Sequence, residues 1–443
     1  MSDLVWNIRR ALGILLFFLF VLLLHINAKA AVDGQLQERI MGNNKGIQLD
    51  IAAKSAILME KNTGVILYEK EMCSIQYPAS ITKIMTALVV LENTALDEMV
   101  TFSQDALFSI EPGSSILGGI EIGDKMSVLD CLYGLMLTSG NEIAYALAEH
   151  VGGNVDIFVK MMNEKSLEIG CLDTSFSNPH GLHDEDHYTS AYDMALIFQE
   201  ALKNQFFCDV INTFRYQFPD TRYGETRIRL NHHKMLENQE YAYEGCLGGK
   251  TGYTAEAGNT LVTYAEHGEL ELICVVLGES SPEHYIDTQK LFDYGFGNYE
   301  VKKIGSMKEF TYVDEFMPDI EKNTSQIVCK NPDAYLVKPK GVTDSDITRE
   351  VSIKIDNIEI DYYFNNTKIG TGVYLFEDNQ NDIKNLWLKQ KSKNFIVINV
   401  KLLFIGVVII IFFSVITMKC IKKTSHIKKR RKRIKKKQIG KMI

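Results

Sequence analysis

Helix-type and strand-type hydrophobic patterns alternate along the chain from about Ile51 to Gly297, and this alternation limits the fold more than any other feature. A stretch of that length can bury a substantial core, and the mixed periods indicate a domain of both helices and strands. The composition agrees, because 46% apolar and 23% charged residues exclude a disordered, collagen-like or small disulfide-stapled protein. The elements that we expect are a hairpin at 53–59 and 64–69, helices at 80–93, 141–150 and 283–294, and a strand pair at 260–265 and 270–277.

The character of the chain changes after about Val301. Short runs that alternate apolar and polar residues, such as 351–355 and 358–363, are typical of half-buried strands. We therefore expect a main domain over 31–300 and a small β-rich domain over 301–394.

The first thirty residues have the features of a secretory signal peptide. Arg9 and Arg10 precede an uncharged apolar run over 11–24, and small residues around Ala30 follow it. The run is short for a bilayer span, and the sequence Ala-Lys-Ala suits a signal peptidase. We expect a signal peptide over 1–30, cleaved after Ala30, with an uncleaved N-terminal anchor as the alternative.

Near the other end, Leu402 to Met418 is an uninterrupted apolar stretch that predicts a transmembrane helix over 395–418. The tail over 419–443 contains 13 Lys+Arg and no acidic residue, so the positive-inside rule keeps this tail in the cytoplasm. The expected location is the cell membrane, as a single-pass protein whose main domain is extracytoplasmic.

The basic tail could instead be a nucleic-acid patch, but the rest of the chain argues against that partner. Val32 to Asn394 holds 31 Lys+Arg against 55 Asp+Glu. A body this acidic is a poor partner for nucleic acid, and a basic segment beside an apolar span fits anionic lipid head groups better. We expect no nucleic-acid partner.

The eight cysteines form no Cys-x-x-Cys pair and no metal-type spacing. Seven of them would lie outside the membrane, which is an odd number. We expect most to be small buried residues and predict no disulfide framework, despite the extracytoplasmic location. The eight are Cys73, Cys131, Cys171, Cys208, Cys246, Cys274, Cys329 and Cys420.

Ser80 and Lys83 form a Ser-x-x-Lys pair at the start of the first expected helix. A spacing of three residues places the hydroxyl and the amine on one helical face, one turn apart. A serine hydroxyl becomes a strong nucleophile when a nearby base takes its proton, and a lysine can be that base if burial or a cationic neighbour lowers its pKa. The pair alone is weak evidence, because ordinary helices with a solvated lysine also contain it.

Two further clusters strengthen the signal. Ser139 and Asn141 lie in a glycine-containing loop before a helix, where they offer a second hydroxyl for proton transfer and a carboxamide for holding a substrate amide. Lys250-Thr251-Gly252 precedes a strand pattern, and an edge strand there can bind an extended peptide while the lysine and threonine bind its terminal carboxylate. The three clusters in this order, in a chain with export signals, are rarely accidental.

The trio Ser-x-x-Lys, Ser-x-Asn and Lys-Thr-Gly resembles that of β-lactamases and penicillin-binding proteins. Four longer segments resemble the low-molecular-mass penicillin-binding proteins that are serine-type D-alanyl-D-alanine carboxypeptidases, and the resemblance covers about Ile51 to Gly297. These segments are Pro78-Ala79-Ser80-Ile81-Thr82-Lys83, Asn178-Pro179-His180-Gly181-Leu182, His187-Tyr188-Thr189-Ser190-Ala191-Tyr192-Asp193-Met194-Ala195 and Lys250-Thr251-Gly252-Tyr253-Thr254. That family commonly attaches to membranes through an amphipathic helix, whereas this chain is expected to span the bilayer.

The resemblance implies four catalytic residues. Ser80 would attack the carbonyl between the two terminal D-alanines of a peptidoglycan stem peptide, with Lys83 as general base. Ser139 would pass a proton to the departing D-alanine, and Asn141 would orient the substrate and Lys83. Water would then release the acyl enzyme.

The resemblance also implies a substrate-binding strand. Lys250 and Thr251 would bind the terminal carboxylate, Gly252 would allow close backbone approach, and the backbone N–H groups of Ser80 and Tyr253 would hold the oxyanion. No metal and no organic cofactor is implied. The implied partners are stem peptides ending in D-Ala-D-Ala, β-lactams as covalent inhibitors, and the bacterial cell membrane.

The fold implied is of the α+β class, with a β-lactamase/transpeptidase-like antiparallel sheet flanked by helices. A helical subdomain would adjoin the sheet, with the catalytic cleft between them, and the β-rich domain and the membrane helix would follow. An enzyme of this kind trims cell-wall stem peptides, limits their cross-linking and so influences cell shape.

Three alternatives stay open on sequence grounds. A β-lactamase would share the acylation apparatus, but it usually deacylates through a glutamate, and no convincing Glu-x-x-Leu-Asn segment lies between Ser139 and Lys250. A penicillin-binding module without turnover would keep the same motifs. A metal-dependent peptidase would use a cluster of potential metal ligands, namely His180, His183, Asp184, Asp186 and His187. These residues are expected to lie in a turn, where their side chains need not meet at one metal ion.

Overall fold

The computed structural model describes residues 49–111, 113–218, 227–304, 327–329, 334–354 and 357–376. The expected signal peptide, membrane helix and basic tail all lie outside these residues. Among the residues described, no helix combines the length and the apolar character that a bilayer crossing requires.

The chain divides into two compact units, each made of several segments. The first comprises Met1–Ile304, Asp333–Glu350 and Asp361–Gly372, and the second comprises Gly305–Pro332, Val351–Ile360 and Val373–Ile443.

A five-stranded antiparallel sheet forms the centre of the first unit, in the order β2-β1-β9-β8-β7. The expected hairpin and the expected strand pair are both confirmed. The strands are β1 (Ser55–Glu60), β2 (Ile66–Lys70), β7 (Cys246–Thr254), β8 (Gly258–His267) and β9 (Leu270–Glu279). Because β7 is the last strand of this order, its outer edge presents backbone groups without a strand partner.

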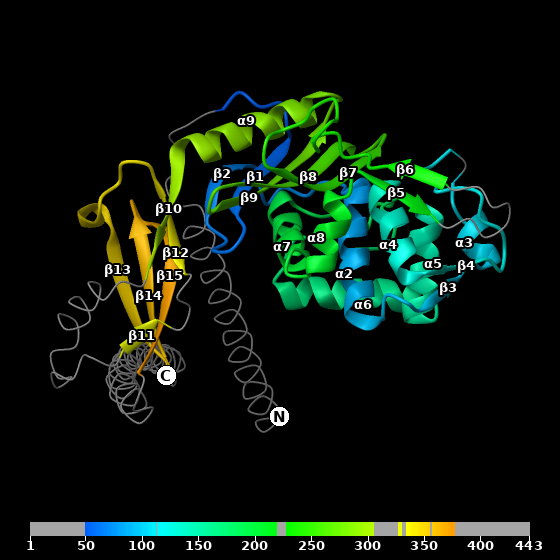
Figure 1. Cartoon of the computed structure of the whole chain (residues 1–443), viewed down its shortest axis with the longest axis horizontal. Helices are drawn as coiled ribbons and strands as arrows, with labels where there is room; N and C mark the ends of the chain where they lie inside the picture. Colours follow the sequence, from blue (N-terminus) through cyan, green and yellow to red (C-terminus); the bar gives the residue numbers. More distant parts are fainter. Residues whose placement is uncertain are drawn as a thin grey trace, which may run out of the picture. The chain divides into compact units, whose positions relative to one another are not determined.

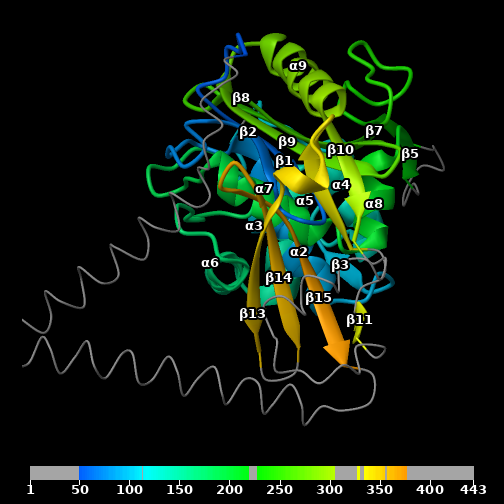
Figure 2. The ribbon, with the colours of Figure 1, turned by 90° about the vertical axis from the view of Figure 1, so that its left-hand side faces the viewer.

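The sheet is covered on both faces, as Figures 1 and 2 show, with α9 (Glu283–Asn298) on one face and a group of helices on the other. Side chains alternate between the faces of a strand. On β9, Ile273 and Val275 accordingly pack in the core beneath the helix group, whereas Cys274 and Val276 pack with Phe292 of α9. Burial on both faces explains why this strand is almost continuously apolar.

Within the described residues, the helix group contains the two helices that the sequence predicted on this face and five that it did not. The five additional helices start at side chains that accept a hydrogen bond from the first turn, which is an N-cap signal visible in the sequence; these caps are Ser103, Ser127, Asn154, Ser190 and Asn204. The helices are α2 (Lys83–Asn93), α3 (Gln104–Phe108), α4 (Val128–Leu137), α5 (Asn141–Gly152), α6 (Val155–Ile169), α7 (Ala191–Ala201) and α8 (Gln205–Asn212).

Two short antiparallel strand pairs accompany these helices. They are β3 (Met99–Thr101) with β4 (Lys125–Ser127), and β5 (Arg215–Phe218) with β6 (Arg227–Leu230).

Most of the described residues after Asn298 lie in strands. The expected strands at 351–355 and 358–363 correspond to β13 and β14. One antiparallel pair consists of β10 (Tyr299–Lys303) and β12 (Tyr335–Pro339). A four-stranded sheet has the order β11 (Ile327–Cys329), β15 (Thr367–Phe376), β14 (Ile358–Phe364) and β13 (Thr348–Ile353). A short 3-10 helix, η4 (Asp344–Asp346), precedes β13.

The six cysteines whose state the structure gives are all free thiols. Burial raises the pKa of Cys73 to about 11 and that of Cys246 to about 12, so both thiols are protonated at neutral pH. The six are Cys73, Cys131, Cys171, Cys208, Cys246 and Cys274.

Candidate active site

Ser80 lies in a 3-10 turn, η1 (Ala79–Thr82), and the regular helix α2 begins only at Lys83. The sequence predicted one continuous helix over 80–93. In a 3-10 turn, side chains three residues apart eclipse one another, so this tighter geometry brings the two side chains closer than an α-helix does. The Lys83 Nζ lies 2.9 Å from the Ser80 Oγ.

The Lys83 side chain is fully buried, and its amine has three oxygen neighbours. Nζ lies 2.9 Å from the Ser80 Oγ, 2.7 Å from the Asn141 Oδ1 and 2.5 Å from the backbone oxygen of His180. A carboxamide oxygen and a backbone carbonyl accept hydrogen bonds and cannot donate. A neutral amine therefore gives its two hydrogens to Asn141 and His180, and its lone pair then faces the Ser80 hydroxyl.

The surroundings of Lys83 favour this neutral amine. Burial and the nearby Lys250 lower the pKa of Lys83 well below its ordinary value, while Glu142 acts in the opposite direction. Lys250 is also almost fully buried, and burial lowers its pKa to about 7. Its Nζ donates to the backbone oxygen of Thr251 at 2.8 Å.

Ser139 and Asn141 stand at the start of α5. Ser139 has a left-handed backbone with φ of 60°, an uncommon conformation for a residue other than glycine. Its Oγ is buried and has no hydrogen-bond partner among the described residues. Since buried hydroxyls are normally paired, this one is available to a bound group.

The edge strand β7 passes very close to the nucleophile. A Cβ placed on Gly252 would lie 2.8 Å from the Ser80 backbone nitrogen and 2.4 Å from the Thr260 Oγ1. Only glycine permits this approach. Tyr253, the next residue, is 65% exposed and leaves the strand edge open to a ligand.

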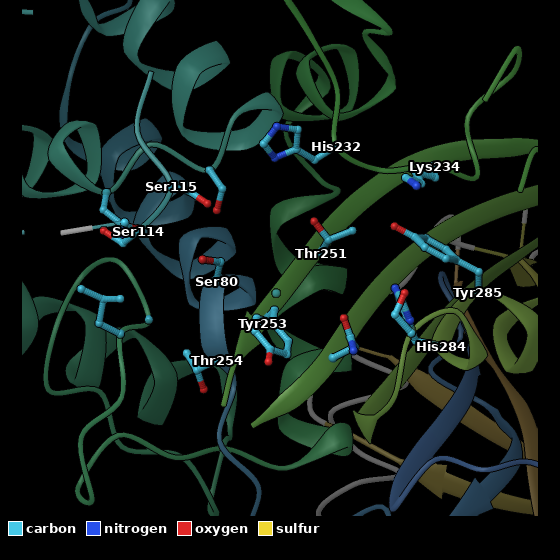
Figure 3. A pocket seen from close by; sticks show the side chains of 18 residues that line it. Ser80, Ser114, Ser115, His232, Lys234, Thr251, Tyr253, Thr254, His284 and Tyr285 are labelled. Atoms are coloured by element: carbon cyan, nitrogen blue, oxygen red, sulfur yellow. The ribbon is translucent and has the colours of Figure 1, made fainter. Parts of the chain in front are cut away.

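These elements border one cleft of about 360 Å³, shown in Figure 3. Six of the eight predicted site residues line it, and the two lysines lie buried outside its lining. Ser80 faces β7 across the cleft, with Thr251 and Tyr253 on the strand side. The sequence-based prediction missed further lining residues, among them Ser114, Ser115, His232, Lys234, His284 and Tyr285.

A hydrogen-bonded chain supports the backbone just before the nucleophile. The His187 Nδ1 accepts from the Ser177 N–H at 3.0 Å, so its Nε2 carries the proton and donates to the Thr82 Oγ1 at 2.8 Å. The Thr82 hydroxyl donates to the Ala79 oxygen at 2.8 Å. Ala79 has φ of 52°, and this chain stabilises that strained residue.

The segment that supplies the His180 carbonyl fits tightly against η1. A Cβ on Gly181 would lie 1.9 Å from the Ala79 oxygen, and Gly181 has φ of 88°, so a glycine is required there. The sequence showed this segment only as part of a resemblance. Its contribution, a backbone acceptor for Lys83, carries no side-chain signal.

The histidines considered as metal ligands belong to this framework. Burial lowers the pKa of His180 to about 3 and that of His187 to about 4, so both are neutral at pH 7. Both ring nitrogens of His187 are engaged by Ser177 and Thr82. In the part of the chain that the structure describes, no three His, Cys, Asp or Glu side chains come together as a metal site would require.

Comparison with known proteins agrees with this geometry. The family model for peptidase S11, described as D-alanyl-D-alanine carboxypeptidase, matches residues 42–281, more than half of the chain. The chain belongs to the peptidase S11 family. Among curated S11 relatives, D-alanyl-D-alanine carboxypeptidase DacF of Bacillus subtilis is 33% identical over 354 residues, which cover 79% of this chain and 86% of DacF. DacA of Escherichia coli K12 is 31% identical over 304 residues, 66% of this chain and 72% of DacA.

Solved structures extend the S11 likeness to the fold. Penicillin-binding protein 6B from Escherichia coli matches with a TM-score of 0.58 and 27% identity, over 75% of this chain and 97% of that protein. A mutant of the Streptomyces K15 DD-transpeptidase matches with a TM-score of 0.53 and 32% identity, over 56% of this chain and its own full length. The expected penicillin-binding-protein type of α+β fold is thus confirmed.

Proposed function

We propose that this S11 protein is a serine-type D-alanyl-D-alanine carboxypeptidase that removes the terminal D-alanine of peptidoglycan stem peptides through an acyl enzyme on Ser80. One observation carries the proposal. The Lys83 amine is buried, two obligatory acceptors hold its hydrogens, and its remaining position faces the Ser80 hydroxyl 2.9 Å away. A lysine held in this way is a base, not a solvated cation.

Acylation begins when Ser80 attacks the carbonyl between the two D-alanines. The Ser80 hydroxyl proton passes to the Lys83 amine as the C–O bond forms. The unpaired Ser139 hydroxyl relays a proton from Lys83 to the leaving nitrogen, the C–N bond breaks, and D-alanine departs as an amine. The Asn141 carboxamide oxygen holds Lys83 in position, and its side-chain N–H groups can donate to the peptide.

The edge of β7 binds the substrate as an added strand. The Lys250 amine and the Thr251 hydroxyl attract the terminal carboxylate, and the backbone N–H groups of Ser80 and Tyr253 stabilise the oxyanion. Hydrolysis then adds water across the ester, which restores the Ser80 hydroxyl and frees the shortened peptide. All of these roles are carried by side chains and backbone of this chain.

β-Lactams fit the same chemistry. Attack of Ser80 on the lactam carbonyl opens the ring and leaves an ester whose leaving group stays attached, so release is slow. A β-lactam labelling assay beside a D-alanine release assay separates the alternatives. Labelling with D-alanine release supports the proposal, labelling without release indicates a binding module, and rapid β-lactam hydrolysis indicates a β-lactamase.

The first test is Ser80→Ala. We expect this substitution to abolish both covalent penicillin labelling and D-alanine release, because the Ser80 hydroxyl is the group aligned with Lys83. Mass spectrometry of the intact protein after β-lactam exposure measures the adduct, and peptide mapping locates it. Persistent labelling at another residue would overturn the assignment of the nucleophile.

We also propose that the enzyme is a single-pass membrane protein with its catalytic unit outside the cell, where it acts in peptidoglycan synthesis. The sequence supports this through the signal-like segment over 1–30, the apolar stretch over 395–418 and the basic tail. Deleting 401–443 should release the enzyme from the membrane fraction and change turnover of a short peptide less than about twofold. Activity lost from a folded truncated protein would contradict the separation of anchor and catalysis.

A further inference from the structure

Glu142 is a buried acid that the mechanism above does not use. It follows Asn141 in α5 and is only 3% exposed. Its Oε1 accepts from the backbone N–H of Leu117 at 2.7 Å and of Gly118 at 3.3 Å. Its Oε2 is buried and has no hydrogen-bond partner within the described residues.

The two N–H groups belong to a loop, residues 113–119, that borders the catalytic cleft. Ser114 and Ser115 of this loop line the cleft opposite β7, as Figure 3 shows. The Asn141 N–H donates to the Ser115 oxygen at 2.9 Å, so α5 holds the loop at two adjacent residues. The later part of the loop, with Ile116 and Gly118, lines a second, mainly apolar cavity of about 450 Å³.

The free oxygen of Glu142 points toward the Ser-x-Asn motif. A Cβ on Gly140 would lie 3.3 Å from the Glu142 Oε2. The middle residue of the motif therefore leaves room for the carboxylate. Among the described residues, Glu142 is also the one acid that acts appreciably on the charge of Lys83.

We propose, on the basis of the function proposed above, that Glu142 is a positioning residue of the active site. Its carboxylate holds the loop over 113–119 in place along the cleft and supplies a negative charge to the surroundings of the buried Lys83. Glu142 does not touch the substrate and takes no proton in the reaction.

The charged groups around Lys83 explain why such an acid matters. Lys250 from β7 disfavours the ammonium form of Lys83 and Glu142 from α5 favours it, while His180 and His187 are neutral. Without Glu142, the described residues would supply no acid that compensates the charge of the two buried amines, Lys83 and Lys250. Once Ser80 has attacked and before the C–N bond breaks, Lys83 holds the proton that the leaving group needs, and the Glu142 carboxylate stabilises that ammonium.

Burial is the largest effect on Glu142, and the pKa of this carboxyl is raised above its ordinary value. The Gly118 and Leu117 N–H groups and Lys83 act in the opposite direction and favour the ionised form. The Cys131 thiol of α4 also lies within its field, and burial keeps that thiol protonated. Within the described ranges, no other acid is among the groups that shift the pKa of Glu142.

The test uses Glu142→Gln and Glu142→Ala in the full chain, with Glu279→Gln as the matched control. Glu279 is likewise buried and lacks a hydrogen-bond partner among the described residues, but it does not act on Lys83. The rate of Ser80 labelling by a fluorescent penicillin and the rate of D-alanine release are measured from pH 4 to pH 10.

The glutamine variant keeps an acceptor for the loop and loses the charge. Because Glu142 raises the pKa of Lys83, we expect the acidic limb of the labelling profile to move to lower pH by on the order of one unit, with a similar alkaline plateau. The alanine variant loses both functions, so its limb moves equally and its plateau falls about tenfold. Glu279→Gln should follow the wild type.

The outcomes separate this inference from the proposed function. Failure of the wild-type protein to form a Ser80 adduct would remove the proposed function and this inference with it. A normal wild-type adduct, with the limb of Glu142→Gln superimposed on that of Glu279→Gln, would overturn only the electrostatic role of Glu142. An unchanged plateau in Glu142→Ala, with a normal thermal unfolding transition, would overturn its role in holding the loop.

Discussion

At the residue scale, the chemistry of this site depends on where Lys83 is placed. The same side chain at the surface would be a cation with an ordinary pKa. Full burial and Lys250 lower the pKa of this amine, and two obligatory acceptors hold its hydrogens, so the neutral form is favoured and its lone pair can face Ser80. Small changes in the charge around this amine should therefore change the pH dependence of acylation.

Asn141→Asp tests this dependence directly. The carboxylate would sit 2.7 Å from the Lys83 Nζ, where the carboxamide oxygen now lies, and would stabilise the ammonium form. An opposite charge at this distance raises the pKa of a lysine by about 1–3 units, so acylation at pH 7 should fall at least tenfold and its acidic limb should move to higher pH. Stopped-flow labelling with a β-lactam across the pH range measures both effects.

Asn154→Asp is a suitable control for that substitution. Asn154 caps α6, and aspartate is an equally good N-cap, so the pH profile should stay unchanged. A lower plateau for Asn141→Asp without any movement of the limb would show that Asn141 contributes geometry alone.

At the element scale, the cleft depends on the close approach of three backbones. The 3-10 turn η1, the segment with Gly181 and the edge strand β7 meet around Ala79 and Ser80, and glycines stand where a Cβ would collide. His187 and Thr82 connect the first two through hydrogen bonds. The nucleophile is therefore held by elements that are far apart in the sequence.

Gly252→Ala should separate β7 from the nucleophile. The added methyl would lie 2.8 Å from the Ser80 backbone nitrogen, so the strand must shift and the oxyanion pocket must open. We expect a loss of about 100-fold or more in acylation, comparable to the removal of an oxyanion donor. Gly297→Ala, in α9 with nothing within 4 Å of its added methyl, should keep full activity. Equal acylation rates for the two variants would contradict the proposed placement of β7.

At the scale of the whole molecule, the stability of the first unit should depend on pH through Glu279, at the end of β9. Burial, Asp287 and Glu283 raise the pKa of this carboxyl to about 8, whereas Lys70 and Lys290 oppose the shift. The folded protein therefore binds the proton more tightly than the unfolded chain does. Its contribution to the free energy of unfolding is fully present below about pH 4.5 and is lost as the pH rises to about 8.

Glu279→Gln should flatten this dependence. Between pH 5 and pH 8, the free energy of unfolding of the wild type should fall by on the order of 3 kcal/mol more than that of the variant, because glutamine does not ionise. Urea unfolding of the purified chain at the two pH values measures the difference. Glu237→Gln, at an exposed glutamate, serves as control, and an identical pH slope for Glu279→Gln and wild type would contradict the assignment.

The sequence predicted the features that depend on local spacing. The spacing of Ser80 and Lys83 placed the two side chains together, and the strand and helix periods located β1, β2, α5, β8, β9 and α9. The helices α3, α4, α6, α7 and α8 were not predicted, although a serine or an asparagine caps the first turn of each.

Other features were outside the reach of the sequence. The His180 carbonyl lies 97 residues from Lys83 in the chain and contributes through its backbone, which every residue has. Glu142 could be read only as one more acid on a helix until the loop over 113–119 and Lys83 were placed beside it.

The order of residues alone thus determined the chemical groups available to this protein, the export and anchoring signals that we expect, and the spacing of three residues between a hydroxyl and an amine. The tertiary structure decided in which direction the pKa of that amine shifts. Burial and the charges of Lys250 and Glu142 arise only when β7, α2 and α5 pack together, and a pKa is set by the groups nearby in space, whatever their distance along the chain.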